Sequence, residues 1–218
     1  MIDSPSSVTR WLVLRRWAPT LLLCAAMGAC GSVDEPADAE PEPESTEVDP
    51  QVTFWDNLQS MCGQAYEGRL VESVPPDPSF EGQRMVMHVR SCDVAEIRIP
   101  FFVGEDRSRT WVLTPTSVGL RLKHDHRHED GSEDEVTQYG GDTEGRGTGE
   151  SQDFHADDFT AELVPAAATN IWTIELVPGV SFAYALRREG SDRRFRAEFD
   201  LSQPIDTPLP PWGAEEPE

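Results

Sequence analysis

Three of the five histidines of this chain stand at alternate positions in the stretch "LRLKHDHRHEDGSEDE", residues 120–135. In an extended strand, side chains two positions apart point to the same side of the sheet. His124, His126 and His128 would therefore share one face with the leucines that precede them. Neutral imidazole is a common metal ligand, and its softness suits Zn²⁺ or Cu²⁺. The stretch predicts a metal site at the rim of a sheet.

The spacing of the histidines limits how many of them one ion can contact. His124 and His128 would lie about 13 Å apart along a strand that rises roughly 3.3 Å per residue. An ion bound at about 2.0–2.1 Å from each nitrogen reaches two neighbours, so we assign His124 and His126 as the ligand pair. Candidates for the remaining ligands are Glu129, Asp130, His88 and His155. The alternative is a strand that ends in a solvated acidic loop and binds no ion.

Aromatic residues supply a second candidate site. Trp111, Trp172 and Tyr184 fall on the apolar sides of expected strands and could line a pocket for a small ligand. Filling of the core is the alternative role for the same side chains. The sequence contains no HExxH, GxSxG, CxxC or phosphate-binding glycine motif, so we assign no catalytic residue. A hydrolase without a recognisable motif remains an alternative function.

Strict alternation of apolar and polar residues predicts the strands that carry these side chains. The pattern is typical of antiparallel strands with one face in a core and one in water. We expect about eight strands, which include 66–74, 84–90, 96–101, 109–113, 118–126, 172–176, 180–187 and 194–201. A meander of this size protects its edges by closing. The sequence therefore predicts an all-β fold, an antiparallel meander in a closed or partly closed calycin-like barrel, with a β-sandwich as the alternative.

One short helix opens the domain and carries a cysteine at its end. Phe54, Leu58 and Met61 recur at helical spacing, and Cys62 follows them directly. In an oxidising compartment Cys62 and Cys92 would form a disulfide. Closing a loop of about thirty residues stabilises a fold by roughly 3–4 kcal/mol. The bond would connect the helix to the sheet.

The N-terminus carries an export signal. Residues 1–29 combine early arginines with the apolar run "WAPTLLLCAAMGA" and predict a signal peptide. The last four letters of "WAPTLLLCAAMGAC" resemble the lipobox of bacterial lipoproteins, and this resemblance implies that Cys30 is lipidated. The lipid would anchor the protein to the outer membrane of the cell envelope. Secretion without an anchor is the alternative.

Composition divides the rest of the chain into one domain and two extensions. Residues 30–51 are rich in carboxylates and proline and predict a disordered tether after the lipidated cysteine. Residues 205–218 predict a disordered tail for the same reason. The folded domain is expected at 52–204, with a mobile acidic loop at 129–158.

The balance of charge excludes one class of partner. The chain carries 18 basic and 40 acidic side chains, a formal net charge of −22. Such a charge repels nucleic acid and anionic lipid surfaces. We therefore expect no nucleic-acid partner, and contact with a membrane only through the N-terminal lipid.

Several phrases of the domain resemble a family of secreted bacterial proteins: "FWDNLQSMCG", "RIPFFVGEDRSRTWVLT", "LKHDHRHEDG", "YGGDT" and "LVPAAATNIWTIELVPG". The resemblance implies export and a common fold, and it implies no activity. A helix that leads into a meander is similar, in architecture alone, to the lipocalin and fatty-acid-binding barrels. The sequence thus predicts a non-enzymatic lipoprotein that binds a small ligand or a protein partner, with divalent-metal binding as the second expectation.

Overall fold

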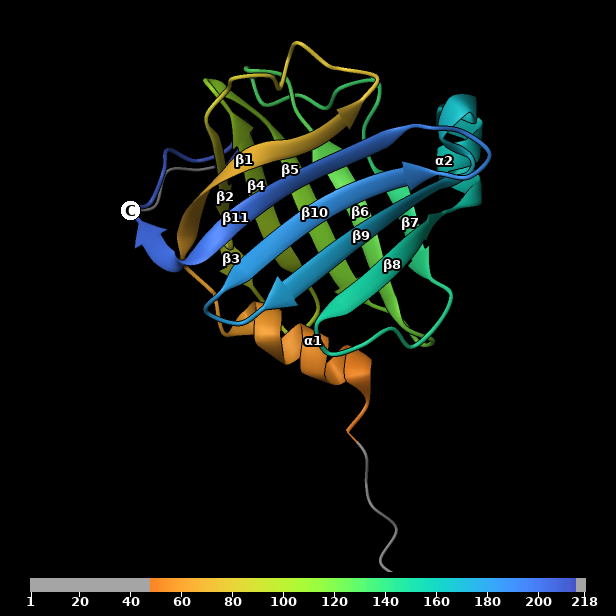
Figure 1. Ribbon diagram of the computed structural model, residues 1–218, viewed down its shortest axis with the longest axis horizontal. Helices are drawn as coiled ribbons and strands as arrows, with labels where there is room; N and C mark the ends of the chain where they lie inside the picture. Colours follow the sequence, from red (N-terminus) through yellow and green to blue (C-terminus); the bar gives the residue numbers. More distant parts are fainter. Residues whose placement is uncertain (1–47, 215–218) are drawn as a thin grey trace, which may run out of the picture. The chain divides into compact units, whose positions relative to one another are not determined.

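The computed structural model describes residues 48–214 and contains a closed antiparallel β-barrel (Figure 1). Its helices are α1 (Pro50–Gln59), α2 (Asp158–Leu163) and the 3-10 helix η1 (Pro165–Ala167). Its strands are β1 (Ala65–Val74), β2 (Met85–His88), β3 (Ser91–Cys92), β4 (Ile97–Val103), β5 (Asp106–Pro115), β6 (Leu120–His126), β7 (Tyr139–Thr143), β8 (Ser151–Ala156), β9 (Asn170–Val177), β10 (Ser181–Arg188) and β11 (Arg194–Ile205). The prediction of an all-β barrel is confirmed.

Pairing between β2 and β4 closes the sheet. The strands follow one another in the order β2-β1-β11-β10-β9-β8-β7-β6-β5-β4-β3, and Met85–Met87 of β2 also pair with residues 101–103 of β4. A ring of 10 strands results, while the short β3 pairs with β4 beside it. Because one sheet closes on itself, the β-sandwich alternative is wrong.

Two strands occupy a segment that we expected to be a mobile loop. β7 and β8 both lie within residues 129–158, and they connect β6 to β9. The glycines of β7 obscured this strand, because glycine is depleted in strand interiors. A Cβ atom on Gly141 would lie 1.6 Å from the carbonyl oxygen of His155. Glycine is therefore needed here for the close approach of β7 to β8.

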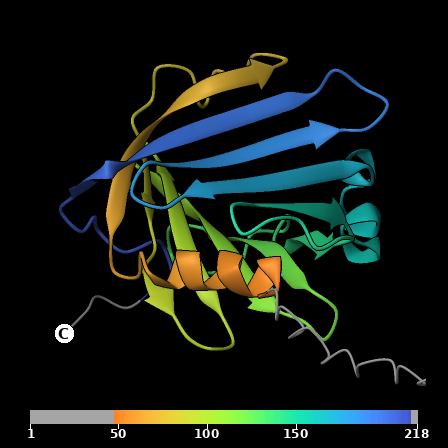
Figure 2. The same cartoon turned by 60° about the horizontal axis from the view of Figure 1, so that its bottom comes forward.

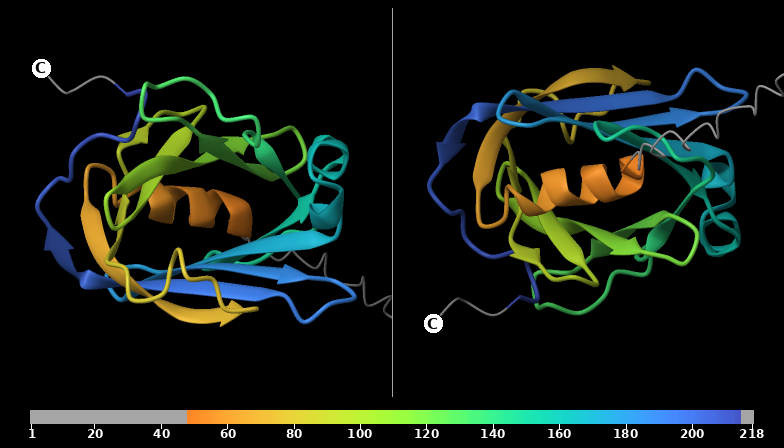
Figure 3. Two further views of the ribbon diagram at one scale, coloured as in Figure 1. Left: turned by 90° about the horizontal axis from the view of Figure 1, so that it is seen from above. Right: turned by 90° about the horizontal axis from the view of Figure 1, so that it is seen from below.

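Helix α1 lies across one end of the barrel and closes it (Figures 2 and 3). Phe54 and Leu58 point from the helix into the core and are fully buried. Pro50 occupies the first turn of the helix, and the Asp49 side chain accepts a hydrogen bond from the backbone N–H of Gln51 at 2.9 Å. Proline suits the first helical position because its missing N–H would have no partner there. The expected domain start at residue 52 moves to Asp49.

A disulfide joins Cys62 to Cys92, with their Cα atoms 6.0 Å apart, so this prediction is confirmed. The separation fits the usual geometry of such bonds. Cys62 follows α1, and Cys92 belongs to β3, which pairs with β4. The bond therefore fixes the helix that closes the barrel to the edge of the sheet.

Residues 206–214 pack on the outside of the barrel, so the expectation of a disordered tail is wrong for this part of it. The backbone N–H of Trp212 donates to the carbonyl oxygen of Arg107 at 3.1 Å. In return, the Arg107 guanidinium donates to the carbonyl oxygen of Pro210 at 2.8 Å. Pro210 and Pro211 are buried by this contact. Proline and tryptophan thus supply the apolar surface that a composition rich in carboxylates obscured.

The expected signal peptide at 1–29, the lipidation of Cys30 and most of the tether lie outside the described residues. Within residues 48–214, no helix is both long enough and apolar enough to cross a membrane.

Candidate functional site at the barrel mouth

A cavity of about 350 Å³ lies at the end of the barrel opposite α1. Its walls come from the ends of β1, β6 and β10 and from the starts of β5, β7, β9 and β11. Antiparallel strands alternate in direction, so these ends meet at one rim. The connection between α2 and β9 borders the mouth through Val164 and Ala167. The volume falls within the range of about 300–1,000 Å³ that is usual for small-molecule pockets.

The floor of the cavity is aromatic. Trp111, Trp172 and Tyr184, the three residues proposed from the sequence as ligand contacts, all line it. Trp111 stacks on Tyr184 with ring centroids 4.4 Å apart and on Phe101 at 4.8 Å. Since Trp111 is 2% and Trp172 1% exposed, most of each ring packs in the core and only part of its surface reaches the cavity. The same side chains thus fill the core and form the apolar base of a pocket.

His124 lines the cavity and is held by two hydrogen bonds. Its Nδ1 lies 3.1 Å from the carbonyl oxygen of Tyr139, and its Nε2 lies 2.7 Å from the hydroxyl of Tyr184. A carbonyl oxygen only accepts, so Nδ1 carries the proton and Nε2 of the neutral ring accepts from Tyr184. Burial lowers the pKa of His124 to about 3, which keeps the ring neutral. Both nitrogens are therefore engaged in hydrogen bonds, which an ion bound at Nε2 would have to displace.

His126 also faces the cavity, one step nearer to the rim. Its Nε2 lies 3.2 Å from the Tyr139 hydroxyl. In the register of β5 and β6, Arg109 stands directly opposite His126. Burial, followed by the positive charge of Arg109, lowers the pKa of His126 to about 4. Burial likewise raises the pKa of Tyr139 to about 12. The histidine pair therefore forms a neutral hydrogen-bonded wall at ordinary pH.

The rim of the cavity is polar and includes three arginines, Arg109, Arg188 and Arg193. Sequence reasoning missed them, although the alternation of each strand contains the signal. Arg109 precedes Trp111 by two positions, Arg188 follows Leu186 by two, and Arg193 precedes Phe195 by two. Each arginine thus continues the inward face of its strand to the mouth. A change from apolar to cationic residues along one inward face indicates a pocket mouth.

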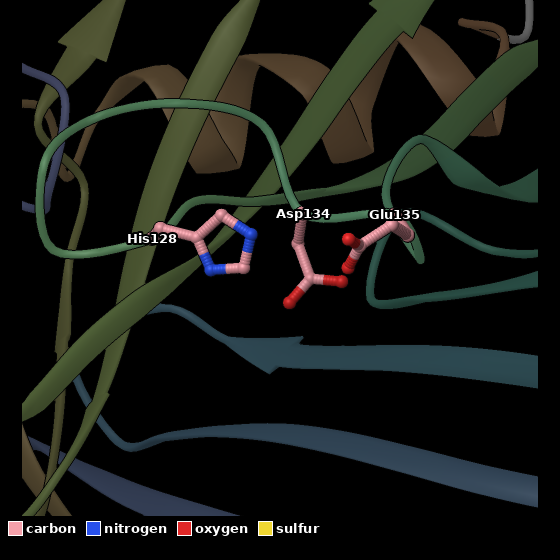
Figure 4. A group of neighbouring side chains, drawn as sticks. All are labelled: His128, Asp134 and Glu135. Carbon is pink, nitrogen blue, oxygen red and sulfur yellow. The ribbon is translucent and has the colours of Figure 1, made fainter.

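The group of side chains best placed to hold a metal ion lies beside this rim. Among residues 48–214, ligand atoms of His128, Asp134 and Glu135 all lie within 4.8 Å of one another (Figure 4). Neither His124 nor His126 belongs to the group. His128 and Glu135 are exposed and Asp134, which also lines the cavity, is half-buried. The structure thus places carboxylates beside His128, the histidine to which the sequence assigned the smallest part.

The further candidate ligands lie apart from this group. His88 is 4% exposed, and its Nδ1 has no hydrogen-bond partner within the described chain. His155 lies with its Nδ1 3.7 Å from Glu144. Glu129 and Asp130 are exposed in the turn after β6, where Asp130 accepts hydrogen bonds from Ser132. None of the four joins the predicted pair.

Comparison with family models, with curated proteins and with solved structures found no match to this chain. The site is therefore interpreted from its own geometry.

Proposed function

We propose that the barrel binds a small ligand in the cavity at its mouth and has no enzymatic activity. The observation that carries the proposal is the convergence of Trp111, Trp172 and Tyr184 on one cavity of about 350 Å³. An apolar base with a few polar groups at the opening is the usual composition of a small-molecule site. The hydrogen bonds of His124 and Tyr184 fix the walls before any ligand arrives, which reduces the entropic cost of binding.

Titration with the neutral fluorophore N-phenylnaphthylamine (NPN) tests this function. We expect saturable binding with one site per chain. Val164→Trp, which places a large ring at the mouth, should weaken the affinity at least about tenfold. Val180→Trp is the matched control, because Val180 is 60% exposed in the turn between β9 and β10. Absence of saturable binding, or equal effects of the two substitutions, would contradict the proposal.

We further propose that the protein acts in the cell envelope, anchored through a lipid on Cys30. The signal peptide and lipobox pattern of the sequence support this, and the disulfide is compatible with an oxidising compartment. In a detergent phase-partition experiment the wild type should enter the detergent phase. Cys30→Ser should move the protein to the aqueous phase. A wild type that already partitions into water would rule out the anchor.

Divalent-metal binding is the second candidate function, and the group of His128, Asp134 and Glu135 favours it. One imidazole and two carboxylates suit Zn²⁺, although two exposed side chains must lose hydration to hold it. Calorimetry with Zn²⁺ and metal-stripped protein separates the two histidine sites. His128→Ala should abolish binding if this group is the site, whereas His124→Ala with His126→Ala should abolish it if the predicted pair is. Equal heats from the wild type, from His128→Ala and from the double variant would exclude both sites.

A further inference from the structure

Two guanidinium groups stand together at one side of the cavity mouth. Arg188 ends β10 and Arg193 precedes β11, so both flank the same hairpin, and both line the cavity. Burial and the nearby charge of Arg193 lower the pKa of Arg188. Both side chains are half-buried, and their like charges repel each other. Such an arrangement costs free energy unless something negative occupies the space between them.

Most arginines of the described chain form an ion pair with a carboxylate, and Arg188 and Arg193 do not. Nine of them form an ion pair with a carboxylate within 4.0 Å: Arg69, Arg84, Arg98, Arg109, Arg121, Arg127, Arg146, Arg187 and Arg196. Within residues 48–214, neither Arg188 nor Arg193 forms such a pair. Arg188 instead donates to the side-chain oxygen of Asn170 at 2.8 Å. Arg188 and Arg193 therefore line one pocket without a carboxylate of the described chain within ion-pair distance of either.

The neighbouring carboxylates are already engaged elsewhere. Asp77 lines the cavity and lies within electrostatic range of Arg193, but it accepts hydrogen bonds from the backbone and hydroxyl of Ser79 at 3.0 and 2.6 Å. Asp134, between β6 and β7, also lines the cavity, and it accepts a hydrogen bond from the backbone N–H of Val136 at 2.8 Å. The charge of Arg188 and Arg193 is therefore only partly offset by the protein.

We propose that the ligand of this cavity is an amphipathic anion, with an oxyanion head group between Arg188 and Arg193 and an apolar body on the Trp111 side of the cavity. The inference rests on the function proposed above and specifies the class of ligand. Guanidinium groups bind carboxylate, sulfonate and phosphate oxygens through charge-assisted hydrogen bonds. The net charge of −22 opposes the approach of any anion, so affinity must come from these local contacts.

A pair of fluorophores separates the two proposals. Anilinonaphthalene sulfonate (ANS) has the aromatic body of NPN and adds one sulfonate, so NPN reports on the cavity and ANS reports on the cavity plus the anion contact. Arg188→Gln with Arg193→Gln should weaken ANS binding about tenfold or more and leave NPN binding within about twofold. The matched control is Arg187→Gln with Arg194→Gln. It removes the same charge from adjacent positions outside the cavity lining, and both ligands should bind it as they bind wild type.

Each other outcome overturns a stated part of this account. If NPN binds and the two double variants weaken ANS equally, charge acts only at long range and the anion site is wrong. If Arg188→Gln with Arg193→Gln weakens NPN and ANS to the same extent, the arginines support the wall and do not bind the head group. If wild type binds neither fluorophore, the ligand-binding function itself fails, and the ligand class fails with it.

Discussion

At the scale of single residues, burial keeps the His124 ring neutral. The sequence predicts that its side chain points inward, because the alternation from Leu120 continues to the histidine. What the alternation could not reveal is the partner on each nitrogen, because the Tyr139 carbonyl belongs to β7, a strand that the sequence did not predict, and the Tyr184 hydroxyl lies 60 residues further along the chain. A pattern of residue types predicts which way a side chain points. Whether a histidine binds an ion or forms hydrogen bonds depends on residues that the fold brings next to it.

The buried histidines should make the stability of the fold depend on pH. The pKa of His124 is lowered from 6.5 to about 3, so below pH 6.5 the unfolded chain binds a proton that the folded protein does not. The free energy of unfolding should therefore fall as the pH drops from about 6.5 toward 3. Urea unfolding between pH 7 and 5 measures this slope. His124→Gln should reduce it by up to about 1.4 kcal/mol per pH unit.

The remaining slope in that variant comes from His126 and His88, whose pKa values burial also lowers. His128→Gln is the control, since this side chain is exposed, and it should keep the wild-type slope. A slope that does not change in His124→Gln would mean that the ring is protonated in the folded protein.

At the scale of elements, long alternating runs were predictable and short ones with glycine were not. β9, β10 and β11 follow their sequence patterns, because the alternating apolar side chains of their central parts enter the core. β7 contains five residues, two of them glycine, and its place depends on pairing with both β6 and β8. Such a close approach between two strands cannot be predicted from the residues of one strand alone.

Gly141 provides a test of that approach. Gly141→Ala should destabilise the fold by about 3 kcal/mol, because its Cβ would collide with the carbonyl oxygen of His155. Gly145→Ala is the control, since no atom lies within 4 Å of the added carbon, and its effect should stay within about 0.5 kcal/mol. Chemical denaturation measures both. Equal stabilities of the two variants would mean that β7 is not held against β8 as described.

The disulfide connects the turn after α1 to β3, and its removal should lower the stability of the fold. Replacing Cys62 and Cys92 together with serine should lower the free energy of unfolding by about 3–4 kcal/mol, because the unfolded chain regains the freedom of a loop of 30 residues. Chemical denaturation measures this loss. Wild-type stability after reduction, with both thiols shown to be free, would contradict this role.

At the scale of the whole molecule, the sequence predicted an all-β barrel, closed or partly closed, but left a β-sandwich open as the alternative. Antiparallel alternation indicates a meander, and a meander can form a barrel or a sandwich. The choice depends on tertiary pairing: Met85–Met87 pair with β4, and the last strand, β11, pairs with β1. The aromatic base of the cavity was predictable from inward parity. Which residues surround the mouth depends on which strand ends lie side by side, and only the closed barrel determines that.

The central claim is that a ligand occupies the mouth of the barrel, and the indole N–H signals of tryptophan in an NMR titration test it most directly. Trp111 and Trp172 line the cavity, whereas Trp55 belongs to α1 at the closed end and Trp212 packs outside the barrel. Saturating NPN should shift the signals of Trp111 and Trp172 and leave those of Trp55 and Trp212 in place. Shifts confined to Trp55 or Trp212, with Trp111 and Trp172 unchanged, would contradict the account.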